Sequence, residues 1–276
     1  MSSVLYIVST PIGHLDDITR RAIAVLNEVD WVAAEDTRHS QRLLASLGIR
    51  ARLISCHDHN ECQRSAELVA RLQNGEKGAL ISDAGTPLVS DPGYRLVRAC
   101  QEADIAVVPV PGASALLAAL AVAGQPSDRF LFEGFLPAKG AARQQAVERL
   151  AGQAMTTIVY EAPHRVLSLL QALAEVVAPE REITLCRELT KQFETVRRGT
   201  VADIAAWVAG DSNQQRGELV LVLSPAALSA GWSDRDQALA TSLLAELSVS
   251  RVAKIMAAHT GIKRQAVYAL LEATNG

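Results

Sequence analysis

VLYIVSTPIGHLDDITRRAIAVLNEV, residues 4–29, contains a short apolar run, then a polar turn, then an amphipathic segment. The run Val4–Val8 is rich in β-branched residues, which favours a buried strand. From Thr19 onwards apolar residues recur at helical spacing, and the Thr19 hydroxyl can cap the helix. This stretch therefore predicts one strand–loop–helix unit.

The same order of elements recurs before residue 124. Further strands are predicted at 31–34, 52–55, 78–81 and 105–108, each followed by a predicted helix, through 43–47 and over 61–73, 92–103 and 113–123. Regular alternation of strands and helices is typical of a parallel sheet with helices on both faces. We therefore expect residues 1–123 to form an N-terminal parallel α/β domain.

Residues 124–226 break this alternation. Because the stretch 124–140 contains glycine, proline and three phenylalanines, we interpret it as the link between two domains. Two predicted strands, 182–188 and 192–198, follow each other closely, which indicates an antiparallel pair. With further strands predicted at 156–160 and 218–223 and helices at 165–177 and 201–208, we expect a second, mixed α/β domain over 124–226.

The end of the chain differs again. After a second predicted linker, 224–236, only helices are predicted, at 237–247, 249–259 and 263–272, and the last two resemble a helix-turn-helix with Gly261 at the turn. We expect residues 233–276 to form a small C-terminal helical domain. Between residues 249 and 271 there is no acidic residue, and the basic residues are Arg251, Lys254, Lys263 and Arg264. This charge makes the domain an RNA-binding candidate, and a solvated helical cap is the alternative.

The composition is that of an ordinary globular protein, with 49% hydrophobic and 21% charged residues. The net charge of −3 argues against a protein that coats nucleic acid by charge alone. Four cysteines without CxxC spacing, no basic signal-peptide start and no apolar run long enough to span a bilayer are typical of a soluble protein in a reducing compartment. We therefore expect a cytoplasmic protein.

Loops rich in glycine, proline and small polar residues follow the predicted strands of the first domain, at 9–13, 35–40, 57–61, 82–93 and 109–115. Ligands of open α/β sheets bind beyond the carboxyl ends of the strands, so these loops predict a ligand cleft. Ordinary turns and caps are the alternative, and Asp91–Pro92 has the residue types of a helix N-cap and first turn. The signatures of Rossmann dehydrogenases, P-loop enzymes, serine hydrolases and zinc proteases are absent.

Three of the loops carry chemically active side chains. SCHDHNEC, residues 55–62, holds two cysteines and two histidines, but its spacing fits no common zinc motif, so no metal is expected. EDTR, residues 35–38, offers either a general base or a capped helix start. RELTK, residues 187–191, together with the following arginines offers either a phosphate-binding edge or a charged edge strand that discourages aggregation.

A set of short motifs extends in order over residues 8–223, namely VSTPIGHLDDIT, EDTR, HNE, SDAGTPLVSDPG, PGASA, GFLP, YEAPHR, RELTK and RGELVLVL. This set resembles the tetrapyrrole methylase superfamily, which uses S-adenosylmethionine (SAM), and in particular its branch that acts on ribosomal RNA. The resemblance implies two α/β domains with a SAM cleft between them, commonly as a homodimer. It also implies 2′-O-methylation of a cytidine in the decoding region of 16S ribosomal RNA, in the free RNA or the small subunit.

The resemblance also implies roles for individual residues. It places SAM on Pro11, Ile12, Asp83, Gly85, Thr86, Val89, Ser114, Ala115 and Tyr160, with Gly217 and Glu218 as weaker candidates. For catalysis we select Glu35, Asp36, Arg38, Glu161 and Lys191, with Glu61 and His164 as further candidate bases. Phosphates of the RNA would contact Arg187 and the four cations of the helical domain, and Arg38 and Lys191 could also bind flanking phosphates.

Two other functions remain open at this point. A methyltransferase acting on a small corrin-type ring could use the same cleft, but the helical domain and EDTR disfavour it. A regulator that senses SAM and binds DNA would account for the helix-turn-helix pattern.

Overall fold

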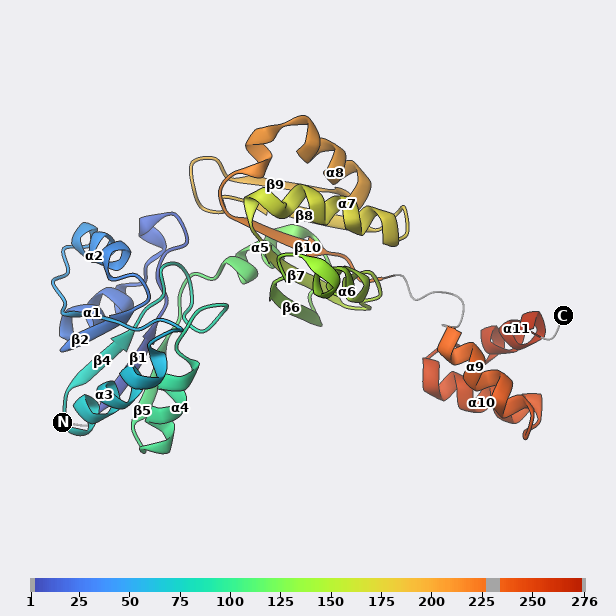
Figure 1. The fold of residues 1–276 in the computed structure, drawn as a ribbon, viewed down its shortest axis with the longest axis horizontal. Coiled ribbons are helices and arrows are strands. Elements are labelled where there is room, and N and C mark those ends of the chain that lie inside the picture. The colour runs from blue at the N-terminus through green and yellow to red at the C-terminus, as the bar shows by residue number, and fades with distance from the viewer. Residues whose placement is uncertain (1–2, 227–233, 275–276) are drawn as a thin grey trace. The chain divides into compact units, whose positions relative to one another are not determined.

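The computed structural model describes residues 3–226 and 234–274 (Figure 1). The chain divides into two compact units, Met1–Pro225 and Ala226–Gly276. The first unit contains two five-stranded sheets and the second contains helices.

The first sheet is entirely parallel. Its strands lie in the order β3-β2-β4-β1-β5, and they are β1 (Val4–Val8), β2 (Trp31–Ala34), β3 (Leu53–Ser55), β4 (Lys77–Leu80) and β5 (Ala106–Val110). Every residue of β2 is buried, as expected for a strand that is covered on both faces. The predicted parallel α/β architecture is confirmed.

Two pairs of helices cover the faces of this sheet. Leu26 of α1 (Arg20–Glu28) and Leu44 of α2 (Thr37–Ser46) share one apolar core, which lies on one face. Leu68 of α3 (Glu61–Gln73) and Leu96 of α4 (Tyr94–Glu102) share another core with Trp31. At the carboxyl edge of the sheet lie the loops that follow the strands.

The second sheet is mixed. Its strands lie in the order β6-β7-β10-β8-β9, and only the β6–β7 pair is parallel. The strands are β6 (Phe130–Phe135), β7 (Thr156–Glu161), β8 (Glu182–Arg187), β9 (Thr195–Thr200) and β10 (Leu219–Leu223). The predicted antiparallel pair is β8 and β9, so the expectation of a mixed sheet is confirmed.

The interpretation of residues 124–140 as a link was wrong, because residues 130–135 form an edge strand of this sheet. The strand register shifts between Phe132 and Gly134, and Gly134 has φ +66°. This irregularity disguises the two-residue alternation by which strands are recognised. Helix α6 (Gly140–Ala151), which follows, was also missed.

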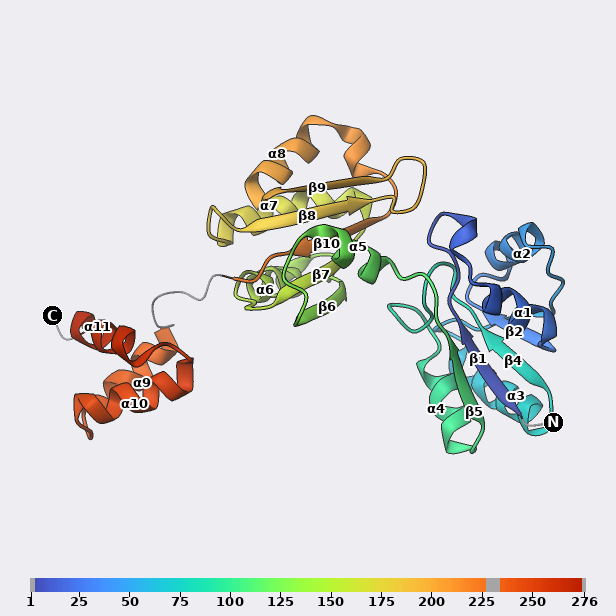
Figure 2. The ribbon, with the colours of Figure 1, turned by 180° about the vertical axis from the view of Figure 1, so that it is seen from behind.

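The helices of this region lie on opposite faces of the second sheet (Figures 1 and 2). Helices α6, α7 (Val166–Val176) and α8 (Val201–Gly210) share one core with β7, β8 and β10. On the other face, Ala119 and Ala123 of α5 (Ala115–Ala123) pack with Ile158 and Val222. Although α5 falls within the first domain expected from the sequence, it packs against the second sheet. Short 3₁₀ helices lie at Leu15–Asp17, Pro163–Arg165 and Ser212–Gln215.

The second unit is a bundle of three helices, α9 (Asp234–Leu244), α10 (Val249–Thr260) and α11 (Arg264–Thr274). Its buried core contains Ala240, Val252, Met256, Val267 and Leu271. Gly261 ends α10 in the left-handed conformation, with φ +72°, at the turn predicted from the sequence. The predicted small helical domain is confirmed as an architecture.

Candidate active site

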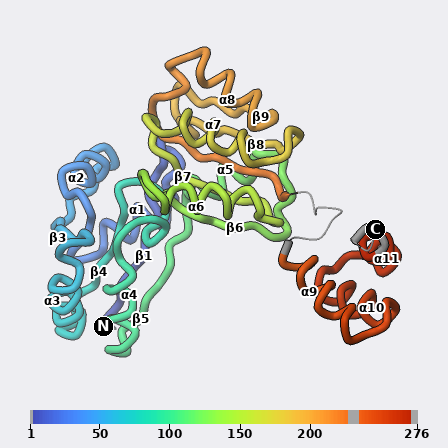
Figure 3. The backbone as a smooth tube through the Cα atoms, turned by 45° about the vertical axis from the view of Figure 1, so that its right-hand side comes forward, coloured from blue at the N-terminus to red at the C-terminus, as the bar shows by residue number. Residues whose placement is uncertain are grey.

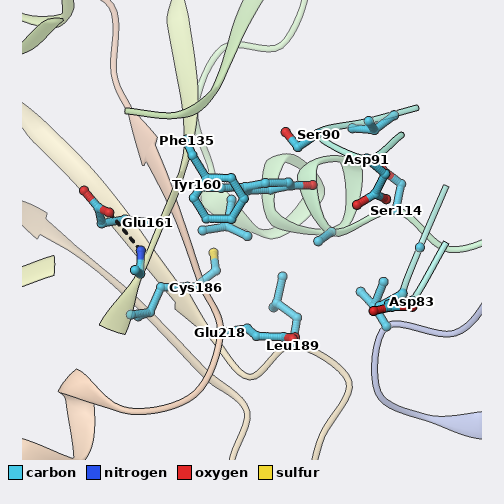
Figure 4. A pocket seen from close by; sticks show the side chains of 18 of the residues that line it. Asp83, Ser90, Asp91, Ser114, Phe135, Tyr160, Glu161, Cys186, Leu189 and Glu218 are labelled. Carbon is cyan, nitrogen blue, oxygen red and sulfur yellow. Dashed lines mark hydrogen bonds between the residues drawn. The ribbon is translucent and has the colours of Figure 1, made fainter. Parts of the chain in front are cut away.

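The first unit contains a cavity of about 440 Å³ that side chains from both sheets line. Ligand pockets of proteins commonly have about 300–1,000 Å³. The loops after β2, β4 and β5 form one wall, and residues of β7, β8, β10 and their loops form the other (Figure 4). The cavity therefore lies at the edge of the first sheet where the sequence predicts a ligand.

Three of the predicted loops are joined at this edge. Thr10 and Gly85 exchange backbone hydrogen bonds, with N···O distances of 2.8 and 3.1 Å. The Thr86 hydroxyl donates to the carbonyl of Ala113 at 3.0 Å and lies 3.0 Å from the hydroxyl of Ser9. These bonds hold the loops after β1, β4 and β5 as one assembly, with Gly85 (φ +82°) at its centre.

The loop 82–93 continues in an unusual backbone conformation. Leu88 and Ser90 have φ of +73° and +65°, which non-glycine residues adopt only where the surrounding structure imposes it. The prediction that Asp91–Pro92 caps a helix was wrong, because α4 begins at Tyr94 with Gly93 at its N-cap. The loop thus carries Asp91 into the cavity wall.

Glu61, a candidate base from the sequence, supplies the cap that α4 needs. Its buried carboxylate accepts hydrogen bonds from the backbone N–H groups of Gly93 at 3.0 Å and Arg95 at 2.8 Å. This position satisfies otherwise unpaired donors at the helix start. The structure therefore gives Glu61 a role in holding the loop 82–93.

Most of the residues selected for SAM lie on the cavity wall. The lining includes Ile12, Asp83, Gly85, Thr86, Val89, Ser114, Ala115, Tyr160, Gly217 and Glu218, whereas Pro11 is not part of it. Other lining residues were not predicted from the sequence, among them Ala84, Ser90, Asp91, Phe135, Cys186 and Leu189. All of these except Cys186 belong to the motifs named above, so the motifs were the available signal.

An aromatic cluster forms part of the second wall. The ring of Tyr160 makes edge-to-face contacts with Phe132 and Phe135, with centroid distances of 4.9 and 5.5 Å. Figure 4 shows Phe135 beside Tyr160. The Tyr160 hydroxyl accepts a hydrogen bond from the backbone N–H of Leu116 at 3.1 Å. Burial raises the pKa of Tyr160 to about 12, so this group stays a neutral phenol. Phe135 remains 56% exposed.

Three carboxylates, those of Glu35, Asp83 and Asp91, line the opposite wall. Burial raises the pKa of Asp91 to about 6, and the charge of Glu35 adds to this rise. Burial also raises the pKa of Glu35, with a further contribution from Asp83. Asp83 accepts a hydrogen bond from the backbone N–H of Asp36 at 3.2 Å. Carboxyl groups that titrate near neutral pH are suited to proton transfer.

Asp36 has the structural role that the sequence left open for EDTR, because it caps the start of a helix. Its carboxylate accepts hydrogen bonds from the backbone N–H groups of His39 at 3.2 Å and Arg38 at 2.8 Å, and it is the N-cap of α2. These bonds hold the pKa of Asp36 below its usual value. Glu35 alone of the two carboxylates lines the cavity, and Arg38 is exposed and outside its lining.

Glu161 borders the cavity but is paired. Its fully buried carboxylate lies 2.9 Å from Nη2 of Arg143 and 2.8 Å from Nε of Arg165, and it accepts the N–H of Ala162 at 2.8 Å. A carboxylate held by two guanidinium groups is a poor proton acceptor. The candidate base His164, which immediately precedes Arg165, is exposed and does not line the cavity.

We predict that Glu161→Gln lowers the free energy of unfolding by about 3–5 kcal/mol, because two partly buried guanidinium groups lose their charged partner. Glu148→Gln, on the exposed face of α6, is the control and should cost less than about 0.5 kcal/mol. Urea unfolding measures both variants. A normal stability combined with a strongly reduced reaction rate would show instead that Glu161 acts in the chemistry.

Lys191 lies in the loop between β8 and β9, outside the lining. Its ammonium group is 2.9 Å from a carboxylate oxygen of Glu188 and 2.8 Å from one of Glu218. Burial alone would lower the pKa of Lys191, but these two partners raise it above its usual value. A Cβ atom on Gly13 would lie 2.5 Å from Cγ of Lys191, so the first loop and RELTK are in close contact.

The arginine of RELTK is buried rather than available to RNA. Arg187 is 9% exposed, and its Nη2 donates to the carbonyl of Phe193 at 3.1 Å and to the hydroxyl of Thr195 at 3.4 Å. These bonds hold the turn between β8 and β9. This burial contradicts the predicted phosphate contact of Arg187.

Among the residues that the structure describes, no group of three or more histidine, cysteine, aspartate or glutamate residues is arranged to hold a metal ion. In SCHDHNEC, Cys56 is buried and Cys62 is exposed, and the rings of His57 and His59 meet edge to face at 6.0 Å. In the same described part of the chain, no helix combines the length and apolarity that crossing a membrane requires.

Two family models match the chain. Residues 4–205 match the family described as Tetrapyrrole (Corrin/Porphyrin) Methylases, and residues 230–273 match the RsmI C-terminal HTH domain. The first match covers both sheets except for the last strand, and the second covers the helical unit.

Curated relatives are similar over nearly the whole chain. The ribosomal RNA small subunit methyltransferase I of Pseudomonas aeruginosa is 49% identical to this chain, and the alignment covers 97% of this chain and 96% of that protein. The protein of the same name from Escherichia coli O157:H7 is 48% identical and covers 96% of this chain and 93% of its own.

Solved structures show the same fold in more distant proteins. A uroporphyrin-III-C-methyltransferase from Thermus thermophilus has a TM-score of 0.56 at 23% identity, covering 80% of this chain and 94% of its own. The cobalamin biosynthetic enzyme cobalt precorrin-4 methyltransferase, CbiF, has a TM-score of 0.61 at 17% identity, covering 80% and 95%. At these identities the likeness concerns the fold alone.

Proposed function

We propose that this chain, which belongs to the tetrapyrrole methylase family and within it to the ribosomal RNA small subunit methyltransferase I proteins, methylates 16S ribosomal RNA with SAM as methyl donor. The acceptor we propose is the 2′-oxygen of a cytidine in the decoding region. The proposal rests mainly on the similarity to rRNA methyltransferases, which extends over both units of the chain, including the helical unit.

The cavity fits the proposed cofactor. Ser114 and Ala115, at the start of α5, line it, and a helix start attracts a carboxylate such as that of the methionine part of SAM. The carboxylate of Asp83 suits its cationic groups, and the left-handed backbone at Gly85 lets a ligand approach the loop closely. Bound SAM supplies an activated methyl group.

For removal of the 2′-hydroxyl proton we propose the pair Glu35 and Asp91. Both line the cavity, and the charge of Glu35 adds to the rise in the pKa of Asp91 that burial causes. The other carboxylates selected from the sequence have partners, since Asp36 caps α2 and Glu161 is held by two arginines. Arg38 and Lys191, which lie outside the lining, are proposed to act on RNA phosphates rather than on the reacting atoms.

We propose that the helical unit, expected over residues 233–276, binds RNA. Its four cations, Arg251, Lys254, Lys263 and Arg264, are all exposed, while its apolar residues form a core of their own. Nη2 of Arg264 donates to the backbone carbonyl of Ser250 at 3.3 Å and to its hydroxyl at 3.0 Å, so the first turns of α10 and α11 lie together. Four exposed cations on an independent core favour a polyanionic partner.

We expect a variant with all four of these cations changed to glutamine to bind RNA with a salt dependence shallower by roughly 3 units, close to 0.7 for each phosphate that is no longer neutralised. Because the apolar core is untouched, the helical unit should stay folded. Filter binding at several salt concentrations measures the slope. Equal affinity, slope and methylation in variant and wild type would show that the unit is a structural cap.

We further propose a cytoplasmic homodimer. The four cysteines form no disulfide. Leu117 and Val122 expose large apolar side chains on α5, which supports contact with a second copy. Sedimentation of the purified protein tests the oligomeric state.

The proposed function is tested by transfer of labelled methyl groups from SAM to small-subunit RNA, to assembled small subunits, to duplex DNA and to a corrin-type ring. We expect label only in the RNA, at one cytidine ribose. Label in the ring, or SAM-dependent binding to DNA without transfer, would support the corresponding alternative.

A further inference from the structure

The segment 37–57 is strongly basic. It contains Arg38, Arg42, Arg50 and Arg52 and no aspartate or glutamate, in a chain whose net charge is −3. All four arginines are exposed. The segment comprises α2, the connection to β3 and β3 itself, which is an edge strand of the first sheet.

Among the described residues, none of these four arginines forms an ion pair with a carboxylate. In the same unit, Arg71 pairs with Glu67 at 3.3 Å and Arg98 pairs with Glu102 at 2.8 Å. Here the positive charge is left unneutralised on the surface, so it is available to an anion.

A groove of about 740 Å³ lies between α2 and the segment that leads into β3. Thr37, Gln41 and Ala45, on one stripe of α2, line one side, and Arg50 and its neighbours line the other. Arg38 and Arg42 each follow a groove residue by one position, so they form the adjoining stripe of the helix. The groove thus combines one arginine, Arg50, with a hydroxyl and an amide, and two more arginines lie on the adjoining stripe of the helix.

The groove begins next to the candidate active site. Helix α2 starts at Thr37, two residues after Glu35, which lines the cavity. Figure 3 shows α2 and β3 at one side of the first sheet, and β3 is an edge strand of that sheet. A polymer whose ribose enters the cavity therefore has an open, basic path along α2.

We propose that Arg38, Arg42 and Arg50 bind backbone phosphates of the RNA next to the nucleotide held in the cavity. The proposal rests on the proposed function, since it places the polyanionic substrate of that site. Guanidinium groups suit phosphates because they donate paired hydrogen bonds, and Thr37 and Gln41 can add neutral ones. These contacts position the substrate without reading its sequence.

The test is a full-length variant with Arg38, Arg42 and Arg50 changed to glutamine. We expect its affinity for small-subunit RNA to fall at least tenfold at about 0.15 M salt, and the slope of log affinity against log salt to decrease by about 2. SAM affinity, measured by calorimetry, should be unchanged because none of the three arginines lines the cavity. The matched control changes Arg95, Arg129 and Arg149, which are also exposed, to glutamine.

Each outcome bears on one proposal. If the variant binds RNA with the affinity and slope of wild type, or if the control weakens binding equally, this surface is not the RNA path, whatever the methylation assay shows. If RNA binding depends on the three arginines but the wild-type protein methylates no RNA, the result supports RNA binding by this surface and contradicts the proposed function. RNA cross-linked to the segment 37–53 in wild type, and not in the variant, would support the proposal independently.

Discussion

The double variant Glu35→Gln, Asp91→Asn is expected to methylate RNA about 10²–10⁴-fold more slowly than wild type in a single turnover, which is the usual contribution of a general base. Both side chains line the cavity, and the other carboxylates near it are engaged by backbone N–H groups or by cations. SAM affinity should fall far less than the rate, because most of the cavity lining is unchanged.

The methylation rate is expected to depend on pH. A base acts in its ionised form, so the wild-type rate should rise with pH through about 6, where Asp91 titrates. Charged and titratable groups acting on Asp91 are Glu35, Asp83 and Asp58, and Ser82 donates a hydrogen bond to it. Removing the charge of Glu35 makes Asp91 easier to ionise. In Glu35→Gln alone, the rise should therefore move to lower pH.

Asp36→Asn is the control for this pair. Asparagine caps helices as well as aspartate does, so the variant should stay folded and keep its rate. If the double variant retains the wild-type single-turnover rate and pH profile, neither carboxylate removes the proton. A ¹³C NMR titration of labelled aspartate, without substrate, checks the pKa of Asp91 independently of activity.

Gly85→Val is expected to abolish detectable SAM binding in a protein that remains folded. Gly85 has φ +82°, which a β-branched residue adopts only at a cost on the order of 1–3 kcal/mol. A Cβ atom there would lie 3.3 Å from Cγ2 of Ile12 and 3.7 Å from the carbonyl of Ala113. Both neighbours belong to the joined loops, so a shift at Gly85 distorts the wall that is proposed to hold the cofactor.

Calorimetry with SAM measures the loss, and thermal unfolding checks that the protein is folded. Gly210→Val is the matched control, because a Cβ atom at Gly210 meets no atom within 4 Å and the residue lies at the end of α8. Wild-type affinity in Gly85→Val would remove the loop 82–93 from the cofactor site.

Much of the first domain could be predicted from local patterns. Each strand is a short run of β-branched or small apolar residues. Each helix carries apolar residues at helical spacing and is followed closely by a glycine or a polar residue, as α2 is followed by Leu47 and Gly48. The position of the ligand site followed from the same pattern, since parallel strands bring the loops after them to one edge. Gly85, Thr86 and Ser114 lie in these loops, and the family resemblance selected them individually.

The sequence by itself determined the alternating first domain, the mixed second sheet, the separate helical unit and the loops that carry the site. These features are local, because they depend on periodicity, capping and turn residues within a few positions. The tertiary structure decided what depends on partners distant in the chain. Phe130–Phe135 becomes a strand only because β7 lies beside it, and Glu61, 32 residues before Gly93, caps α4 and leaves Asp91 to the cavity. It also decided that Glu161 is locked between Arg143 and Arg165 while Glu35 stays unpaired among the described residues, because burial and charge pairing are properties of three-dimensional neighbours.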